Sequence, residues 1–347
     1  MSWRRRLALS SIGLALLFGA SATAEAFTRP YTAPYDVKQY QDWPEIALAV
    51  GVAWYQNDIE GLEKQLSSEP DAYTADGMLK HGLAYRTVAY IIFTSTSEHP
   101  SQTERWRFLE SWQAKFPDSA APDIIRSMML LEYAYRTPDS TIPPRFPAPG
   151  FLPSNSSLNE ATAALKRAKS RTRVPPVWYN AAINVEIAKH SPFEVLFEIA
   201  DEARASSPQD LQPQFTLLNH LIIDLHWHPT NVETLVRTFA DDGKGNVDVA
   251  RYAQFYLEAF TTHYGITLVR ESNVKWTYMR DGLHALSEKM PTDRLGHQRA
   301  ATACLAGDLT EAKLAFQELK GAAMPSVWRL PKFYEDCRDW VAHQGQP

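Results

Sequence analysis

Apolar residues recur at helical spacing in three successive stretches of this chain, and this pattern constrains its fold more than any other feature. The stripes are Phe193, Leu196, Phe197, Ala200 and Ala203, then Leu211, Phe215, Leu218, Ile222 and Leu225, then Val232, Leu235, Val236 and Phe239. Because residues three or four apart share a helix face, each stripe predicts an amphipathic helix. Three such helices with short connections must pack side by side. No comparable alternating run predicts a sheet.

Capping boxes mark several of the expected helix starts. Each pairs a Ser or Thr with a Glu three residues later: Ser101 with Glu104, Ser157 with Glu160, Ser191 with Glu194, and Thr230 with Glu233. In such a box the hydroxyl accepts a hydrogen bond from a helix N–H group, and the Glu reaches back to the cap. The pattern predicts an all-α protein, an antiparallel stack of helix hairpins with about fourteen helices between Pro44 and Ala342.

A proline-rich segment interrupts the helical pattern at residues 137–155. Its prolines are Pro138, Pro143, Pro144, Pro147, Pro149 and Pro153. Because proline removes a backbone donor and clashes with the preceding turn, no continuous helix crosses this segment. It separates a helical group at 44–136 from a second group at 156–347. The two groups form either two domains or one superhelix crossed by a strap, and Phe146 and Phe151 favour a strap packed on the helices.

Two segments of the chain echo each other, although no strict period is present. Residues 57–66 and 307–316 each contain a turn, a potential capping Asp (Asp58 and Asp308) and a helix. The second echo has the residues expected of half a tetratricopeptide unit at Ala300, Ala312, Phe316, Leu319 and Pro325, but it lacks the large aromatic residue expected early in the first helix. We therefore expect a degenerate tetratricopeptide-like α-solenoid.

The N-terminus has the features of a secretory signal peptide at residues 1–24. Three arginines at 4–6 precede an apolar run at 7–20 and a small-residue segment that permits cleavage after Ala24 or Ala26. An uncleaved membrane anchor is the alternative, but the apolar run is short for a span. The pattern predicts a periplasmic protein with an extended segment at 25–43 and no integral membrane segment after cleavage.

Charge and cysteine content narrow the possible partners. Removing the three leader arginines changes the formal net charge from −5 to −8, which disfavours nucleic acid as a partner. Cys304 and Cys337 are the only cysteines. In an oxidising compartment they form either a disulfide, which would contribute roughly 3 to 4 kcal/mol, or two buried free thiols.

Four motifs resemble those of the bacterial family called domain of unknown function 4034. They are Phe116-Pro117-Asp118-Ser119, Tyr133-Ala134-Tyr135-Arg136, Leu225-His226-Trp227 leading into 236–240, and Ala303-Cys304-Leu305-Ala306-Gly307-Asp308. The resemblance covers about Ile46 to Trp340, and it implies a helical fold without implying an activity. The chain departs from the pattern around Trp227, where His226, His228 and Pro229 replace an expected basic residue and glycines.

His220, Asp224 and His228 form the one candidate metal site. At four-residue spacing they would share a helix face, and His and carboxylate ligands suit zinc. The competing interpretation is a polar helix end, because Pro229 and Thr230 start a new helix there.

Residues 241–248 cluster carboxylates with glycines, but they depart from the calcium-loop pattern at Lys244 and indicate a turn between helices.

The sequence contains no catalytic or cofactor signature. It has no nucleophile elbow, no HExxH motif and no phosphate loop. We therefore expect a binding module for a protein or peptide, with no cofactor, and we expect toxin neutralisation or envelope assembly as its role. The alternative is an envelope enzyme that depends on a metal or acts on the cell wall.

Overall fold

The computed structural model describes residues 43–67, 80–94, 102–135, 154–171, 174–319 and 322–343. The helices in these ranges are α2 (Trp43–Tyr55), α3 (Ile59–Ser67), α4 (Lys80–Thr94), α5 (Gln102–Lys115), α6 (Ala121–Ala134), α7 (Asn155–Lys169), α8 (Val177–Ala188), α9 (Phe193–Ser206), α10 (Gln212–Asn219), α11 (Pro229–Phe239), α12 (Val249–Ala259), α13 (Leu268–Glu271), α14 (Trp276–Lys289), α15 (Asp293–Ala306), α16 (Leu309–Glu318), α17 (Pro325–Trp328) and α18 (Pro331–Ala342). Two π-helical turns, η2 (His220–Asp224) and η3 (Phe260–Tyr264), extend α10 and α12, and η4 (Gly265–Thr267) is a 3₁₀ turn.

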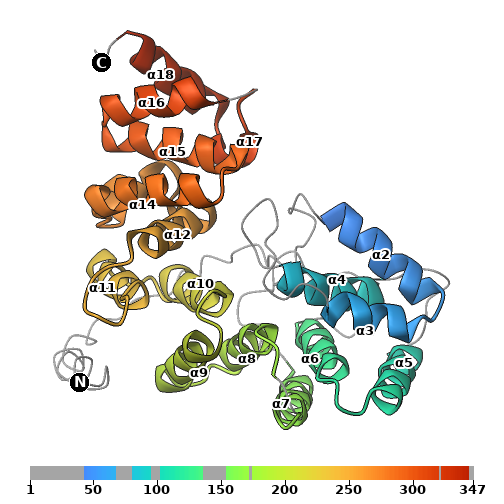
Figure 1. Ribbon diagram of the computed structural model, residues 1–347. Coiled ribbons are helices and arrows are strands. Elements are labelled where there is room, and N and C mark those ends of the chain that lie inside the picture. Colours follow the sequence, from blue (N-terminus) through green and yellow to red (C-terminus); the bar gives the residue numbers. More distant parts are fainter. Residues whose placement is uncertain are drawn as a thin grey trace.

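The helices follow one another along an angled arrangement with two arms (Figure 1). Helices α2 to α6 form one arm, α10 to α18 form the other, and α7 to α9 lie at the corner between them. The described ranges contain no β-strand, which confirms the predicted all-α class. Within these ranges, no helix combines the length and the apolar character needed to cross a bilayer.

Of the three predicted stripes, the third forms a buried helix face over its whole length. In α11, Val232, Leu235, Val236 and Phe239 are all buried. In α9 the stripe is buried from Leu196 to Ala203, but it is wrong at its start, because Phe193 is 40% exposed. The middle stripe is wrong at its end, because Leu225 lies beyond the π-helical turn and is 40% exposed. The π turn adds a residue to the helical repeat and rotates the apolar face, so Leu217 and Leu221 join Leu218 and Ile222 in the core.

The predicted capping boxes are wrong wherever the structure describes them. Helix α7 begins at Asn155, so Ser157 lies inside the helix. Ser191 donates its hydroxyl to Glu186 instead of capping α9. His228 caps α11 by accepting a hydrogen bond from the Thr230 amide at 3.3 Å, and Glu233 turns inward. Ser101 lies outside the described residues.

The two echoed turns are confirmed as helix starts capped by aspartate. Asp58 accepts a hydrogen bond from the Gly61 amide at 2.9 Å, and Asp308 accepts one from the Glu311 amide at 3.0 Å. The residue before each Asp adopts positive φ, 53° at Asn57 and 67° at Gly307. Asn and Gly tolerate this conformation best, so the two turns reverse the chain in the same way.

The hydrophobic core continues past the predicted domain boundary. Helices α6 and α7 pack against each other, and one core cluster runs from Ile46 in α2 through Leu165 in α7 to Trp178 in α8. A second cluster begins at Ile183 in α8 and ends at Cys337 in α18. Segments 1–24 and 137–153 lie outside the described residues, and of the predicted extended segment 25–43 only Trp43 is described, as the first residue of α2.

An arginine connects the C-terminal helices to the π-helical turn η3. In this turn the Gly265 amide donates to the Phe260 carbonyl, the i to i+5 bond of a π-helix. The guanidinium of Arg329 donates to the carbonyls of Phe260 and Thr261 in this turn. Arg329 follows α17 with φ of 57°, so the chain reverses there and brings α18 back toward α15.

A substitution at Gly282 tests how closely α12 and α14 approach each other. A Cβ atom at this position would lie 2.0 Å from the Val249 carbonyl oxygen and 2.7 Å from the Ala253 Cβ. We expect Gly282→Ala to lower the free energy of unfolding by about 1–3 kcal/mol, because overpacking outweighs the better helix propensity of alanine. Gly51 in α2 has open space around the same position, so Gly51→Ala should raise stability by about 0.5–1 kcal/mol. Urea unfolding measures both, and a neutral Gly282→Ala would contradict the packing.

Candidate functional site

The candidate metal ligands do not converge. His220 Nδ1 lies 2.8 Å from Asp224 Oδ2 across the π turn η2, but His228 is occupied in capping α11. Asp224 also lies near Tyr135, whose pKa is raised to about 12, mainly by burial and then by this carboxylate. The described ranges contain no group of three His, Cys, Asp or Glu residues arranged to hold a metal.

Residues 241–248 form the turn between α11 and α12. Asp242 Oδ1 accepts hydrogen bonds from the amides of Lys244 and Asn246, at 2.7 and 3.1 Å. These bonds, the Lys244 amide first, lower the pKa of Asp242. Asp241 accepts from the amides of Gly243 and Gly245 in the same way. The carboxylates hold the turn itself together, as the sequence indicated for an ordinary connection between helices.

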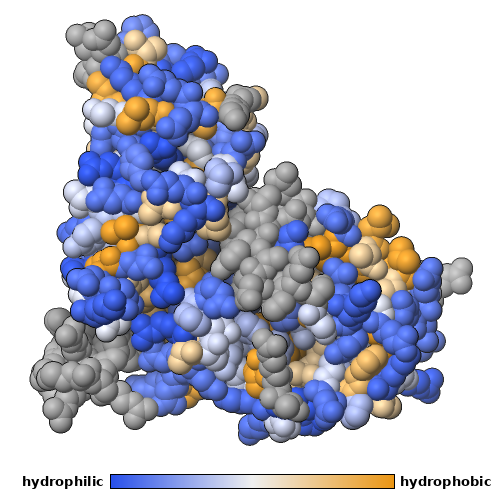
Figure 2. Space-filling model, viewed as in Figure 1, coloured by the Kyte–Doolittle hydropathy of each residue, from blue (hydrophilic) through white to orange (hydrophobic). Residues whose placement is uncertain are grey.

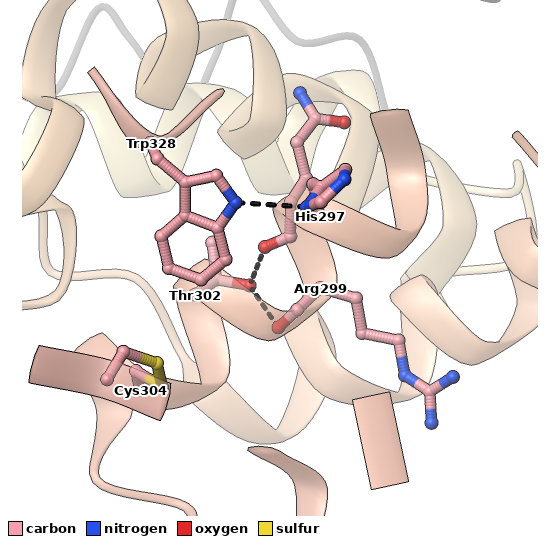
Figure 3. The surroundings of a disulfide bond; sticks show 7 residues. His297, Arg299, Thr302, Cys304 and Trp328 are labelled. Carbon is pink, nitrogen blue, oxygen red and sulfur yellow. Dashed lines mark hydrogen bonds between the residues drawn. A yellow bond between two sulfur atoms is a disulfide. The ribbon is translucent and has the colours of Figure 1, made fainter. Parts of the chain in front are cut away.

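The two cysteines form a disulfide between α15 and α18 (Figure 3). The Cα atoms of Cys304 and Cys337 lie 6.0 Å apart, within the range that a disulfide spans. Cys337 is 4% exposed. The bond closes a loop with a sequence separation of 33 residues and ties the last helix to the hairpin formed by α15 and α16.

Reduction of this disulfide should destabilise the second arm. A loop of this length predicts a loss of about 3 to 4 kcal/mol in the free energy of unfolding, because the reduced unfolded chain gains conformational freedom. Thermal unfolding of the oxidised chain, the reduced chain and Cys337→Ala measures the loss. Equal stability of the oxidised and reduced chains would contradict the expected contribution.

His297 is a buried, neutral hydrogen-bond acceptor beside this disulfide. Trp328 Nε1 donates to His297 Nδ1 at 3.0 Å (Figure 3). His297 is 2% exposed, and its burial lowers its pKa below the usual value near 6.5, despite the opposing effect of Asp293. The indole therefore requires the imidazole to stay unprotonated at Nδ1.

Acid should destabilise the wild-type protein through His297. The pKa is depressed in the folded state, so the unfolded chain takes up the proton first as pH falls below about 6.5. Between pH 7.5 and 5.5 we expect the wild type to lose up to about 1.4 kcal/mol more stability than His297→Gln, whose amide oxygen can still accept from Trp328. Urea titrations at both pH values measure the difference, and parallel losses in the two proteins would contradict it.

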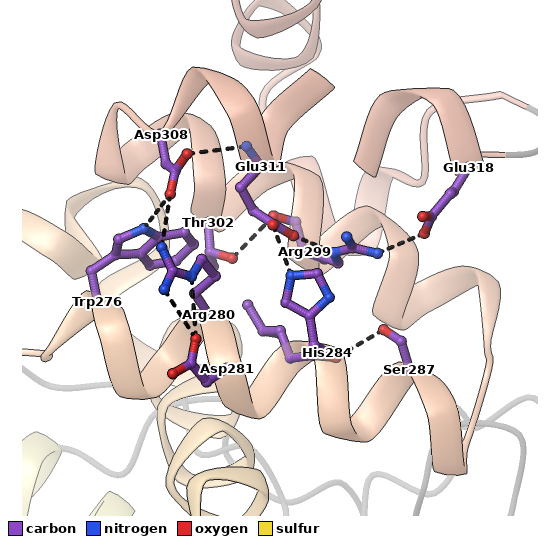
Figure 4. Close-up of polar contacts among 11 residues, drawn as sticks. Trp276, Arg280, Asp281, His284, Ser287, Arg299, Thr302, Asp308, Glu311 and Glu318 are labelled. Carbon is purple, nitrogen blue, oxygen red and sulfur yellow. Dashed lines mark hydrogen bonds and ion pairs between the residues drawn. The ribbon is translucent and has the colours of Figure 1, made fainter. Parts of the chain in front are cut away.

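An ion-pair network with a buried centre at Arg299 and Glu311 crosses α14, α15 and α16 (Figure 4). Arg299, 4% exposed, donates to Glu311 and to Glu318 Oε2, the latter at 2.6 Å. His284 Nε2 lies 2.8 Å from the other oxygen of Glu311. Both Glu311 oxygens therefore have protein partners, which makes this network a structural connection between the three helices.

An open cavity of about 380 Å³ lies between α5, α6 and the end of α7, and its charged lining makes it a candidate binding site. We call it the arginine pocket. Its polar lining consists of Glu110, Gln113, Asp123, Arg126, Arg167 and Arg171. Three guanidinium groups face two carboxylates, so the lining carries an excess of one positive charge in a chain whose net charge is negative.

Asp123 positions two of the three arginines. It is 6% exposed, and its Oδ1 accepts from Arg167 Nε and Nη2 at 2.9 and 2.7 Å. Its Oδ2 accepts from Arg171 Nη2 at 3.4 Å. A buried carboxylate needs paired donors, so α6 holds both guanidiniums at the cavity. Each arginine has five N–H donors, and the buried Nε of Arg171 has no hydrogen-bond partner among the described residues.

Arg126 completes the pocket from α6. Its guanidinium lies 5.0 Å from the centre of the Trp106 ring, a cation–π contact that restrains the side chain. Among the described residues it forms one ion pair, with the exposed Glu110 at 3.4 Å, which is long for such a contact. Arg126 is therefore oriented by an aromatic ring, and within the described ranges only its Nη2 group has a hydrogen-bond partner.

The turn at residues 116–119 contacts two residues of the pocket lining, Gln113 and Arg171. Gln113 Nε2 donates to the carbonyls of Phe116 and Pro117, each at 3.1 Å, and Arg171 Nη1 donates to the Pro117 carbonyl at 2.8 Å. Ser119 Oγ donates to Glu63 Oε2 at 2.9 Å. This turn is the first motif of the family resemblance, so the motif lies next to the pocket.

None of the residues that line the arginine pocket was predicted from the sequence to belong to a site. The one available signal was the basic segment at 166–173, which contains Lys166, Arg167, Lys169, Arg171 and Arg173 in an otherwise acidic chain. Asp123, the partner of Arg167 and Arg171, lies more than forty positions earlier in the sequence. Only the packing of α6 on α7 brings these residues together. No family model, curated protein or solved structure matches the chain.

Proposed function

We propose that this chain is a periplasmic binding module that recognises an acidic segment of a partner protein or peptide at the arginine pocket. The observation that carries the proposal is the group of three arginines oriented by a buried aspartate and an aromatic ring. Guanidinium forks bind carboxylates with two parallel hydrogen bonds, so such a group favours a carboxylate ligand.

The size of the pocket supports a side chain or a chain terminus as the ligand. Sites for whole small molecules usually measure about 300–1,000 Å³. The arginine pocket, at about 380 Å³, lies at the lower end of that range. Its walls come from α5, α6 and the end of α7. A carboxylate of a peptide fits this space while the rest of the peptide extends over the helices.

The wider architecture supports a module that presents a surface. Consecutive helices contact one another from α7 to α10 and from α14 to α16, as in helical-repeat proteins that bind partners along an extended face. On this basis we propose a degenerate tetratricopeptide-like solenoid of the domain of unknown function 4034 type. The leader at residues 1–24 supports export, and neutralisation of a toxin or assembly of the envelope suits a periplasmic binding module.

Binding of a fluorescent pentaglutamate peptide tests the proposal. We expect saturable binding at low salt, measured by fluorescence anisotropy. Arg126→Gln should weaken it about tenfold or more, because a hydrogen bond to a charged group contributes about 1.5–3 kcal/mol. Glu110→Gln should strengthen it, because this variant removes the carboxylate that competes for Arg126.

The control is Arg338→Gln, an exposed arginine on α18 in the other arm. This variant removes the same charge from the protein and should leave the affinity unchanged. If Arg126→Gln and Arg338→Gln weaken peptide binding equally, the loss of affinity comes from the change in net charge and not from the pocket. Absence of binding by the wild type at millimolar peptide would contradict the proposal.

A further inference from the structure

The first described helix, α2, has an apolar face that no other described helix covers. Leu48, Val52 and Tyr55 lie on one side of it at helical spacing, and they are 70%, 46% and 66% exposed. Figure 2 shows apolar surface over this helix at the end of the first arm. Most large apolar side chains exposed elsewhere in the described ranges are isolated, whereas these three form a stripe.

The opposite face of α2 is already used in the core. Ile46, Val50 and Ala53 are buried, and α2 packs against α3 and α4. Glu45 is the only charged residue in the helix. A helix that is apolar on all sides is normally buried on all sides. In helical stacks the outermost helix usually has a polar outer face that ends the stack. Helix α2 lacks such a face.

We propose that α2 pairs with α2 of a second copy of this chain in an antiparallel, two-fold symmetric contact. The exposed stripe is self-complementary when a two-fold axis crosses the helix pair at the height of residue 50. Leu48 and Val52 are equally far from that level, so Leu48 of each copy faces Val52 of the other. Glu45 and Tyr55 are also equally far from it, which places a phenol donor opposite a carboxylate acceptor. A two-fold contact requires this kind of self-complementarity.

The single charge on the face selects the antiparallel direction. In a parallel pair the two Glu45 carboxylates would lie side by side and repel each other. In the antiparallel pair they lie at opposite ends, about ten residues or 15 Å apart along the helix axis. That distance exceeds the screening length of about 8 Å at physiological salt. The antiparallel pair therefore avoids like-charge repulsion without any change in sequence.

The length of α2 determines how strong this contact is. A 13-residue helix is about 20 Å long, and a contact strip about 10 Å wide buries roughly 200 Å² per copy. Stable dimers bury about 800 Å² per partner. The pairing is therefore a weak self-association, which becomes significant where the protein is concentrated or tethered.

Sedimentation velocity of the purified chain between about 10 µM and 1 mM tests the pairing. We expect a monomer at the lowest concentration and a growing dimer fraction at the highest. Leu48→Glu should abolish the dimer. Leu314→Glu, which places the same charge at a 43% exposed leucine in α16 of the other arm, should leave it intact. A wild-type monomer throughout, or a dimer that survives Leu48→Glu, would overturn the proposal.

Cross-linking identifies the direction of the pair. Under mild oxidation, a mixture of Leu48→Cys and Val52→Cys proteins should form mixed dimers faster than either variant forms dimers with itself. Faster cross-linking within each single variant would indicate a parallel pair and overturn the proposed arrangement. Capture of an unrelated apolar peptide by monomeric protein, with no dimer at any concentration, would assign the face to a different partner.

Discussion

The packing of α6 against α7 is the contact on which both the fold and the candidate site depend. Helix α6 is buried on almost every side and contacts α4, α5, α7 and α8. Its Asp123 is buried within this contact, and a buried carboxylate without donors would cost several kcal/mol. Arg167 in α7 and Arg171, two residues after the end of α7, supply those donors. The same ion pairs position the guanidiniums of the arginine pocket.

Local patterns predicted the helices better than they predicted how the helices begin. The stripe at 232–239 gave the buried face of α11, and Asp58 and Asp308 cap the helices expected to follow them. Thr230 was expected to form a capping box with Glu233. In the fold His228 takes the cap, because Glu233 accepts hydrogen bonds from the phenols of Tyr252 and Tyr256 in the core. Tertiary packing overrode the local signal.

The candidate site could not be predicted because its residues are distant in sequence. Glu110, Asp123 and Arg171 come from three helical segments, and no spacing rule connects them. The predicted domain boundary at 137–155 separated Asp123 from both of its arginine partners. Conversely, His220, Asp224 and His228 are close in sequence, but they do not converge. His220 contacts Asp224 across the π turn, whereas His228 caps α11. Proximity along the chain was therefore a poor guide to the site.

The central claim is that the arginine pocket receives a carboxylate, and NMR of the arginine side chains tests it most directly. The buried Nε–H of Arg171 has no partner in the part of the chain that the structure describes, so it should give a slowly exchanging signal that shifts when a glutamate-rich peptide is added. The exposed Nε–H of Arg338, already paired with Asp339, should not shift. Unchanged Arg126 and Arg171 signals at saturating peptide, or equal shifts at Arg338, would contradict the account.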